Sequence, residues 1–278
     1  MFRSLPEKGV TRLAPLKILV TGACGLIGHC AYLHLRDQPA KYEVYGLDLS
    51  RQLSDRVPRS HTFDIPDERF HEVNLTDTQG VRRAVEGMDV VVHMAADPAG
   101  RGWESLHDNN VVGAYNMFEA CKEAGVKRIV PASTIQVITG YQEREPYKAI
   151  VEQRYEDVPE TFQMVTAQMP AEPRNLYASS KVWTESLART YSRQGLSSLV
   201  IRPGWVMEEE QPLRPSAAYV WCSQNDIVQL IECCINAPAD LMFGIFFGMS
   251  DNRWRWVDVE QARELVGYVP RDRGEDRL

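Results

Sequence analysis

The chain of 278 residues lacks several features that mark specialised protein classes. No run approaches the roughly 18 consecutive apolar residues that a membrane-spanning helix needs. Basic residues are in the minority, because 31 lysines and arginines stand against 38 aspartates and glutamates, for a formal net charge of -7. Such a balance provides no basic footprint for nucleic acid. Internal repeats and low-complexity blocks are also missing. The sequence therefore predicts neither a membrane protein nor a nucleic-acid-binding protein.

The six cysteines follow no pattern of a disulfide framework or a metal site. None belongs to a C-x-x-C pair, and no group of histidines and cysteines has the spacing of zinc ligands. We therefore expect no disulfide and no metal, and a reducing cytoplasm as the compartment. Residues 1–16 are too polar and interrupted for a secretion signal. We interpret them as an N-terminal leader that frays or drapes over the body.

From residue 17 onward, short apolar runs alternate with helical stretches. The predicted strands are Lys17–Thr21, Glu43–Asp48, Asp89–His93, Arg128–Ala132 and Ser198–Ile201. The predicted helices lie near Leu26–Arg36, Thr78–Glu86, Glu104–Ala124 and Leu176–Arg193. Buried strands separated by helices indicate βαβ units and a parallel sheet that is covered on both faces. We therefore predict an α/β protein with a doubly wound parallel sheet, whose ligand crevice lies at the carboxyl ends of the strands.

The glycines Gly22, Gly25 and Gly28 follow the first strand with the spacing G-x-x-G-x-x-G. Between a strand and a helix, this spacing allows a tight turn and close approach of the backbone to a pyrophosphate. The N-terminus of the next helix directs free N–H groups at the phosphates. A plain strand-to-helix glycine turn is the alternative. Asp48 ends the second strand, where a carboxylate accepts hydrogen bonds from the adenosine ribose and disfavours a 2′-phosphate. This favours NAD over NADP, although the nearby Arg51 offers a partner for that phosphate.

Tyr177 and Lys181 lie four residues apart on a predicted helix, which places their side chains on one face. A free tyrosine has a pKa near 10, and a neighbouring ammonium together with a positive nicotinamide ring favours its anion. Tyr177 could then act as general base toward a substrate hydroxyl. Y-x-x-x-K alone is common in ordinary helices. Here it accompanies the hydroxyls of Ser133 and Thr134, which follow the strand RIVPA and can orient a substrate oxygen.

Together these residues resemble the extended short-chain dehydrogenase/reductase superfamily, in its NAD-dependent epimerase/dehydratase branch, over roughly residues 17–270. The matching segments are TGACGLIG, HMAA at 93–96, NNVVGAYN at 109–116, VPAST at 130–134, YASSK at 177–181 and IRPG at 201–204. The resemblance implies a Rossmann fold, NAD as cofactor, and Tyr177, Lys181 and Thr134 as catalytic residues. It implies cofactor contacts at Gly22, Gly25, Leu26, Ile27, Gly28, Asp48, Asn74, Leu75, Ala95, Ala96, Asn110 and Lys181. The family's usual aspartate at the adenine is replaced by Asn74.

A finer similarity is to the uronate dehydrogenases, through HMAADPAGRGWESL, ASTIQVITGY and FGIFFGMSDNRWRWVD. Members of that family oxidise the C1 hydroxyl of a uronic acid to a lactone and pass the hydride to NAD. The resemblance implies substrate contacts at Ser133, Gln136 and Arg214, with Arg214 on the carboxylate. A surface arginine near a proline-rich turn is the alternative for Arg214. That family has an asparagine–histidine pair where this chain has Ile135 and Gln136, so a different sugar acid or a nucleotide sugar stays open.

These expectations define a NAD-binding domain over residues 17–203 and a small C-terminal substrate region over 204–278. The polar stretch 140–173 interrupts the alternation just before Tyr177, and we expect it to form a roof over the substrate site, with a solvated surface insertion as the alternative. We expect a NAD-dependent oxidoreductase acting on a sugar. The rivals are a nucleotide-sugar epimerase or dehydratase with retained NAD and a dinucleotide-sensing regulator without activity. The resemblance also implies a homodimer or larger homo-oligomer, through the helices near 104–124 and 176–193.

Overall fold

The structure, a computed structural model, describes residues 14–98 and 100–278. Most of the predicted leader therefore lies outside the described residues. Its last residue, Leu16, is already the first residue of strand β1. The leader thus ends at least one residue earlier than the prediction, because the backbone of Leu16 pairs with the neighbouring strand.

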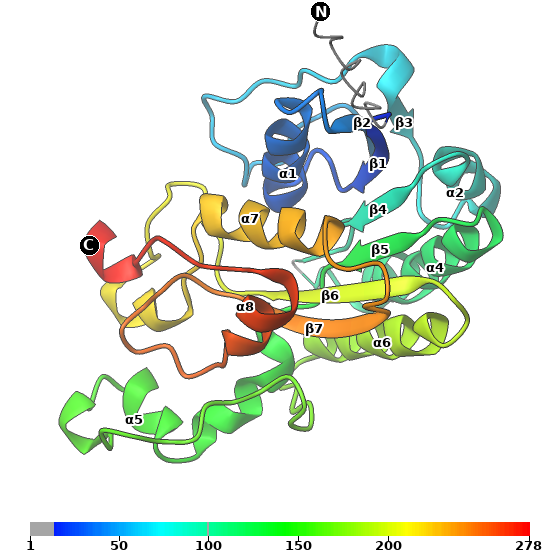
Figure 1. Ribbon diagram of the computed structural model, residues 1–278. Coiled ribbons are helices and arrows are strands. Elements are labelled where there is room, and N and C mark those ends of the chain that lie inside the picture. The colour runs from blue at the N-terminus through cyan, green and yellow to red at the C-terminus, as the bar shows by residue number, and fades with distance from the viewer. Residues whose placement is uncertain (1–13, 99) are drawn as a thin grey trace, which may run out of the picture.

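Seven parallel strands form a single sheet in the described chain, in the order β3-β2-β1-β4-β5-β6-β7 (Figure 1). They are β1 (Leu16–Thr21), β2 (Tyr42–Asp48), β3 (Phe70–Glu72), β4 (Val90–His93), β5 (Arg128–Pro131), β6 (Ser197–Pro203) and β7 (Phe243–Gly248). The strand order reverses between β1 and β4, which opens a crevice at the carboxyl ends of these two strands. This confirms the predicted doubly wound α/β fold. The short strand β3 was not predicted, because three residues show no period.

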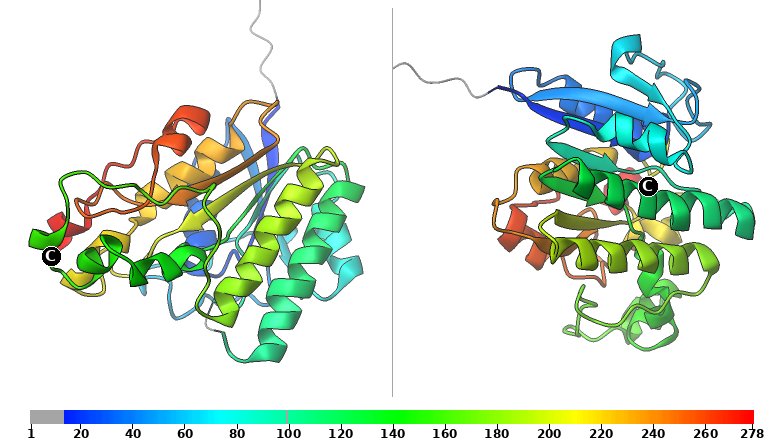
Figure 2. Two further views of the ribbon diagram at one scale, coloured as in Figure 1. Left: turned by 90° about the horizontal axis from the view of Figure 1, so that it is seen from below. Right: turned by 90° about the vertical axis from the view of Figure 1, so that its right-hand side faces the viewer.

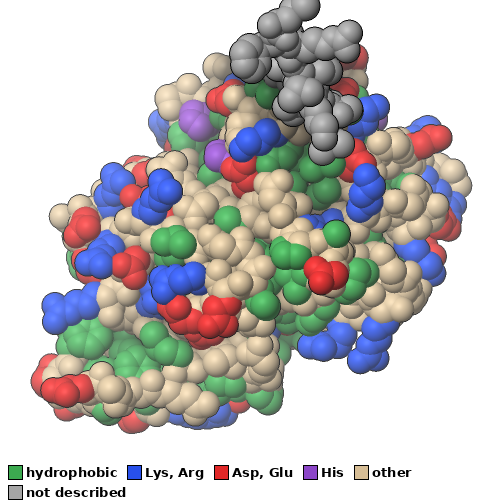
Figure 3. Space-filling view, in the orientation of Figure 1, with side chains coloured by type: hydrophobic (Ala, Val, Ile, Leu, Met, Phe, Trp, Pro, Cys, Tyr) green, Lys and Arg blue, Asp and Glu red, His purple; other side chains and the backbone are tan. Residues whose placement is uncertain are grey.

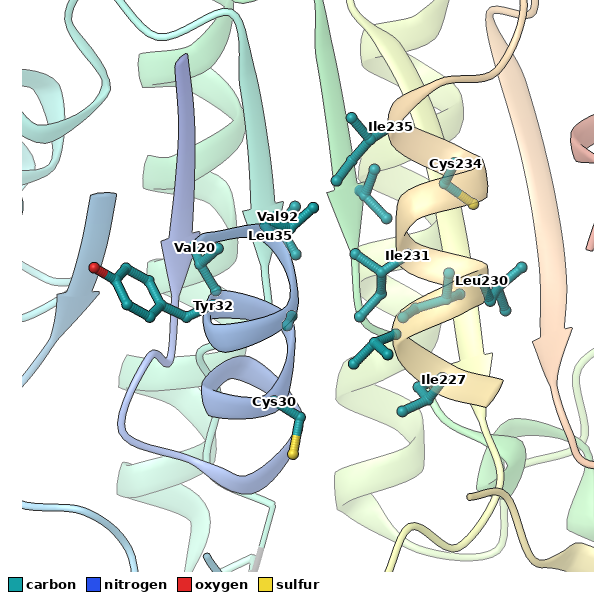
Figure 4. Close-up of a cluster of buried hydrophobic side chains, with 14 of the residues drawn as sticks. Val20, Cys30, Tyr32, Leu35, Val92, Ile227, Leu230, Ile231, Cys234 and Ile235 are labelled. Carbon is teal, nitrogen blue, oxygen red and sulfur yellow. The ribbon is translucent and has the colours of Figure 1, made fainter. Parts of the chain in front are cut away.

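Helices cover both faces of the sheet. On one face, α1 (Leu26–Arg36) lies beside α7 (Gln224–Ile235), and their apolar side chains share a core with β1 and β4 (Figure 4). On the other face, α2 (Thr78–Val85), α4 (Gly113–Glu123) and α6 (Leu176–Ser192) pack side by side over a second core (Figure 2). The two cores explain why the strands are apolar on both sides.

The helix predicted over 104–124 is made of three parts. It begins as α3 (Trp103–Leu106), widens into a π-helix (His107–Val112), and continues as α4. A π-turn inserts one residue into the helical period, which shifts the facing of the side chains that follow. Asn110 lies within this widened turn and is buried. The sequence pattern could not show the change of period.

Capping side chains place the ends of several helices. Ser223 caps α7 by accepting a hydrogen bond from the N–H of Asp226, 2.9 Å away. This cap places the first residue of α7 at Gln224. Asn175 caps α6 by accepting from the N–H of Ala178 at 2.8 Å. That cap fixes the first turn of α6, the turn that carries Tyr177.

The stretch 140–173 folds against the C-terminal part of the chain. It contains α5 (Tyr147–Val151) and the strand-like Val165, which exchanges backbone hydrogen bonds of 2.9 Å with Trp256 and Asp258. Tyr147, Ile150 and Val165 belong to a third apolar core with Trp256. The stretch therefore packs on the C-terminal part of the chain, and none of its residues lines the cavity described below. That it forms a roof over the substrate site stays a prediction. Its apolar side chains pack against residues that are far away in the sequence.

The chain after Pro203 also joins the main sheet. Strand β7 pairs with β6 along its whole length, and α7 completes the core over α1. The last helix, α8 (Glu260–Val266), lies at the edge of the same core. The boundary predicted at residue 203 therefore does not divide the sheet.

Lysines and arginines are interspersed with aspartates and glutamates over the face shown in Figure 3. In residues 14–98 and 100–278, no helix is long and apolar enough to cross a membrane. All six cysteines lie in the described chain, and all six are free thiols.

Candidate active site

A cavity of about 690 Å³ opens at the carboxyl ends of the strands. It extends from the turn between β1 and α1 to the end of β5 and the segment after β6. The predicted site residues in its lining are Gly22, Gly25, Leu26, Ile27, Gly28, Asp48, Leu75, Ala95, Ala96, Ser133, Thr134, Gln136, Tyr177 and Lys181. Residues predicted from six separate regions of the sequence thus meet in one cavity.

The glycine turn leaves no space for larger residues. Gly22 has a φ of +69°, and a Cβ atom there would lie 2.8 Å from the backbone nitrogen of Ala95. A Cβ on Gly28 would lie only 2.1 Å from the carbonyl oxygen of Gly22. Helix α1 then begins without a side-chain cap at Gly25, so its first N–H groups remain available to a ligand in the cavity. An uncapped helix N-terminus beside a tight glycine turn is suited to bind a pyrophosphate.

Asp48 is held in place at the end of β2. Its two carboxylate oxygens accept hydrogen bonds from the N–H groups of Cys24 and Leu49, each at 2.8 Å. Burial raises the pKa of Asp48 from its ordinary value, and the two backbone donors oppose that rise. The carboxylate lines the cavity in a fixed orientation, as a ribose-binding group requires.

Arg51 is turned away from the cavity. Its guanidinium forms an ion pair with Asp67 at 2.5 Å and lies over the ring of Phe70, 5.0 Å from the centroid. It is not among the residues that line the cavity. The alternative in which Arg51 accommodates a 2′-phosphate therefore has no support in this arrangement.

Three side chains meet at the opposite end of the cavity. Thr134 follows β5 and caps the 3-10 helix Ile135–Glu143, because its hydroxyl accepts from the N–H of Gln136 at 3.2 Å. Tyr177 and Lys181 project from the first two turns of α6. The Lys181 ammonium donates a hydrogen bond to the carbonyl oxygen of Ala132 at 2.9 Å. The end of β5 and the start of α6 are thereby tied together around one reactive corner.

Burial dominates the electrostatics of this corner. It raises the pKa of Tyr177, while the neighbouring Thr134 hydroxyl and the positive charge of Arg56 lower it and Asp97 raises it. The Lys181 ammonium is directed at the carbonyl oxygen of Ala132. That Lys181 lowers the pKa of Tyr177 stays a prediction. Burial also lowers the pKa of Lys181 itself, from 10.5 to about 8.

Three other predicted residues, Ser133, Gln136 and Asn110, lie near this corner and have different contacts. The hydroxyl of Ser133 donates to Glu185 at 2.6 Å and is buried in that contact rather than offered to a substrate. Gln136 lines the cavity, with its side-chain oxygen accepting from Asn175 at 2.8 Å. Asn110 lies behind the lining, where its amide donates to the hydroxyl of Ser180 at 3.0 Å.

Asn74 and Arg214 do not line the cavity. The side-chain oxygen of Asn74 accepts from the N–H of Thr76 at 2.9 Å, and the residue is exposed. Arg214 is also exposed, although its neighbour Leu213 lines the cavity. Arg214 thus follows a lining residue in the sequence but is not itself part of the lining.

Sequence reasoning missed several lining residues. They are contributed by loops without a motif: Gln52, Ser54, Arg56, Arg101, Trp205 and Met207. Trp205 could have been found, because it closely follows the carboxyl end of β6. Arg56 and Arg101 lie in irregular loops, where no spacing rule indicates the direction of a side chain.

Replacing Lys181 with methionine is expected to raise the free energy of unfolding near neutral pH by about 1–2 kcal/mol. A shift of its pKa from 10.5 to about 8 corresponds to about 3 kcal/mol for burying the charge, and the lost bond to Ala132 offsets part of that gain. Since the unfolded chain holds this proton more tightly, wild-type stability should rise between pH 8 and 10.5, with the full penalty present below pH 8. Urea denaturation of both proteins at pH 7 and above pH 9 measures this. A methionine variant less stable than wild type at pH 7 would contradict it.

Comparisons with known proteins agree with this geometry. The model of the NAD-dependent epimerase/dehydratase family matches residues 18–212. A NAD-dependent glucose-6-phosphate dehydrogenase of Haloferax volcanii is 29% identical over 258 residues, which cover 92% of this chain and 93% of that protein. A uronate dehydrogenase of Pseudomonas putida is 31% identical over 93% of this chain and 85% of its own length. The crystal structure of a glucuronic acid dehydrogenase from Chromohalobacter salexigens superposes with a TM-score of 0.74, at 27% identity, over 94% of this chain and 86% of that one.

Proposed function

The chain belongs to the NAD-dependent epimerase/dehydratase family, and on that basis we propose that it oxidises the C1 hydroxyl of a uronic acid to the lactone, with NAD as cofactor. The observation that carries the proposal is the meeting of Thr134, Tyr177 and Lys181 in the same cavity as the glycine turn. A regulator that only senses a dinucleotide has no need of this second group of residues.

The cofactor end of the cavity fits NAD. The uncapped start of α1 and the turn around Gly22 supply N–H donors for a pyrophosphate. Asp48 supplies a fixed carboxylate for the adenosine ribose. When bound, NAD supplies a hydride acceptor at its nicotinamide ring.

Tyr177 and Thr134 hold the reacting hydroxyl between them in the proposed mechanism. Tyr177 acts as general base and takes up the proton of the C1 hydroxyl as a carbonyl forms at C1, and NAD, when bound, would accept the hydride that C1 loses. Thr134 orients the substrate oxygen. Lys181 is the proposed contact of the nicotinamide ribose, and its ammonium donates to the Ala132 carbonyl at the end of β5.

The substrate class is supported by two kinds of relatives. Similar proteins include uronate and glucuronic acid dehydrogenases, and also dehydrogenases of glucose 6-phosphate and of L-arabinose. All four are named as dehydrogenases of sugars that carry no nucleotide, which makes the epimerase or dehydratase alternative less favoured. Arg214, which follows the lining residue Leu213, is the proposed partner of the uronate carboxylate.

The test mixes the purified protein with NAD and each sugar of a panel, and the formation of NADH is measured by its absorbance. Glucuronate and galacturonate are expected to be oxidised. Arg214→Ala is expected to raise KM for both roughly tenfold or more, through the loss of a charged hydrogen-bonding partner, and to leave glucose and arabinose unaffected. If no sugar in the panel were oxidised although NAD still bound, the proposed substrate would be wrong and a nucleotide sugar would be favoured.

A second experiment tests cofactor choice. Asp48→Ala is expected to weaken NAD binding roughly tenfold and to improve NADP binding relative to NAD binding. The adenosine ribose loses its hydrogen-bond acceptor, and a 2′-phosphate is no longer repelled by the carboxylate. Arg51→Ala is the matched control, and its NADP-to-NAD ratio should equal that of wild type, since this guanidinium is engaged by Asp67 and Phe70. If only Arg51→Ala changed the NADP-to-NAD ratio, the choice between the two cofactors would depend on Arg51 and not on Asp48.

The assembly and the compartment are also proposed. Helices α4 and α6 expose Tyr115 and Trp183, at 47% and 39%, which supports pairing of these helices with a second copy of the chain. The six free thiols support a reducing cytoplasm.

A further inference from the structure

Arg56 is a cavity residue to which neither the glycine motif nor the reactive group assigns a role. It lies between β2 and β3, in a segment without regular secondary structure, and its side chain lines the cavity together with Gln52 and Ser54. The charged residues in that lining are Asp48, Arg56, Arg101 and Lys181. Each of the other three already has a partner. Asp48 is held by two backbone donors, Lys181 donates to Ala132, and Arg101 lies 3.5 Å from Asp97.

The segment that carries Arg56 is tied to the glycine turn. The N–H of Ser54 donates to the carbonyl oxygen of Cys24 at 2.8 Å. The thiol of Cys24 donates in turn to the carbonyl oxygen of Ser50 at 3.2 Å. These two bonds bring the 50–56 segment alongside the uncapped start of α1. Arg56 is thereby carried to the phosphate end of the cavity.

The positive charge of Arg56 is also near enough to Tyr177 to lower the pKa of that tyrosine. Within residues 14–98 and 100–278, the Arg56 side chain forms no hydrogen bond and no ion pair. An unpaired cation therefore lies between the glycine turn and Tyr177. A dinucleotide that places its ribose at Asp48 and its nicotinamide at Tyr177 must lay its pyrophosphate across this interval.

Charge balance calls for a cation here. The glycine turn contributes N–H dipoles but no cationic side chain, and the nearby Asp48 adds a negative charge next to a ligand group that is itself doubly negative. A planar guanidinium with several N–H donors matches a pyrophosphate in shape and charge.

We propose that Arg56 binds the pyrophosphate of NAD, and that the 50–56 segment holds its guanidinium beside the uncapped start of α1. This inference rests on the proposed NAD-dependent function, and it adds a cofactor-binding residue that the family motif does not contain. The acidic group of the sugar is the competing partner for the same guanidinium, and the experiment separates the two.

The experiment is a titration of the purified full chain with NAD, without sugar, followed by the fluorescence of the protein, in which Trp205 lines the cavity. Arg56→Ala is expected to raise the Kd for NAD about tenfold at low salt. Arg56→Lys should recover part of the affinity, because it keeps the charge and loses the fork of donors. Arg59→Ala, an exposed arginine of the same loop outside the cavity lining, is the matched control and should bind like wild type.

Salt dependence separates a phosphate contact from a structural role. The Kd of wild type should rise with salt more steeply than that of Arg56→Ala, because the variant has lost a screened charge contact. Arg56→Ala with wild-type affinity and wild-type salt dependence would overturn the proposal. So would unchanged NAD binding combined with a raised KM for glucuronate but not for glucose, which would assign the guanidinium to the sugar. Failure of wild type itself to bind NAD would instead contradict the proposed function.

Discussion

Tyr177→Phe is expected to lower the kcat of sugar oxidation by roughly 10³- to 10⁴-fold and to leave the Kd for NAD unchanged. The substitution removes a single oxygen atom, the proposed acceptor of the hydroxyl proton, and keeps the ring that packs at the start of α6. The cofactor contacts at the glycine turn and at Asp48 lie at the other end of the cavity. Steady-state kinetics and an NAD titration of the same preparation measure both parts.

The matched control is Tyr191→Phe, which removes a hydroxyl from the same helix. That hydroxyl donates to Glu119, far along α6 from the cavity lining. It should retain wild-type turnover and lose only the modest stability of one hydrogen bond. Near-wild-type turnover in Tyr177→Phe would rule out the proposed mechanism and would reopen the case for a regulator without activity.

Glu185→Ala is expected to lower the free energy of unfolding by about 3–5 kcal/mol. The Glu185 carboxylate accepts two bonds from Arg202, at 2.7 and 2.8 Å, and a third from the hydroxyl of Ser133 at 2.6 Å. The side chains of the pair are only 8% and 2% exposed. Removing the carboxylate leaves a guanidinium buried without its counter-charge, and Arg202 already has one N–H group without a partner. Urea denaturation followed by circular dichroism measures the loss.

An exposed pair with the same geometry is the control. Arg82 donates to Glu123 at 2.7 and 2.9 Å, but these side chains are 41% and 45% exposed. Glu123→Ala should therefore cost less than about 1 kcal/mol, because water solvates the remaining arginine. If both variants lost the same free energy of unfolding, burial would not explain the contribution of the Glu185–Arg202 pair to stability. Because Ser133 precedes Thr134, Glu185→Ala should also impair turnover at temperatures where it is still folded.

The elements with a clear period were predictable. Helix α1 was predicted at its observed bounds, and β4 to within one residue, because an apolar run between polar turns has few alternatives. The sequence pattern failed where structure depends on distant partners. The stretch 140–173 has no strong period of its own, and Val165 gains its place only by pairing with Val257. The widened turn at Asn110 is likewise invisible, since one inserted residue does not change the overall helical composition.

Local pattern was enough to identify the family and the cofactor and to predict the reactive group. The motifs around Gly22, Asp48 and Tyr177 each work within a few residues of chain, so their spacing alone carries the chemistry. Side-chain direction in the loops was decided only by the tertiary structure. Folding turned Arg51 outward onto Asp67 and brought Arg56, five residues later, into the cavity. The physical reason is that a loop has no repeating geometry, so each side chain points wherever its contacts with distant residues allow.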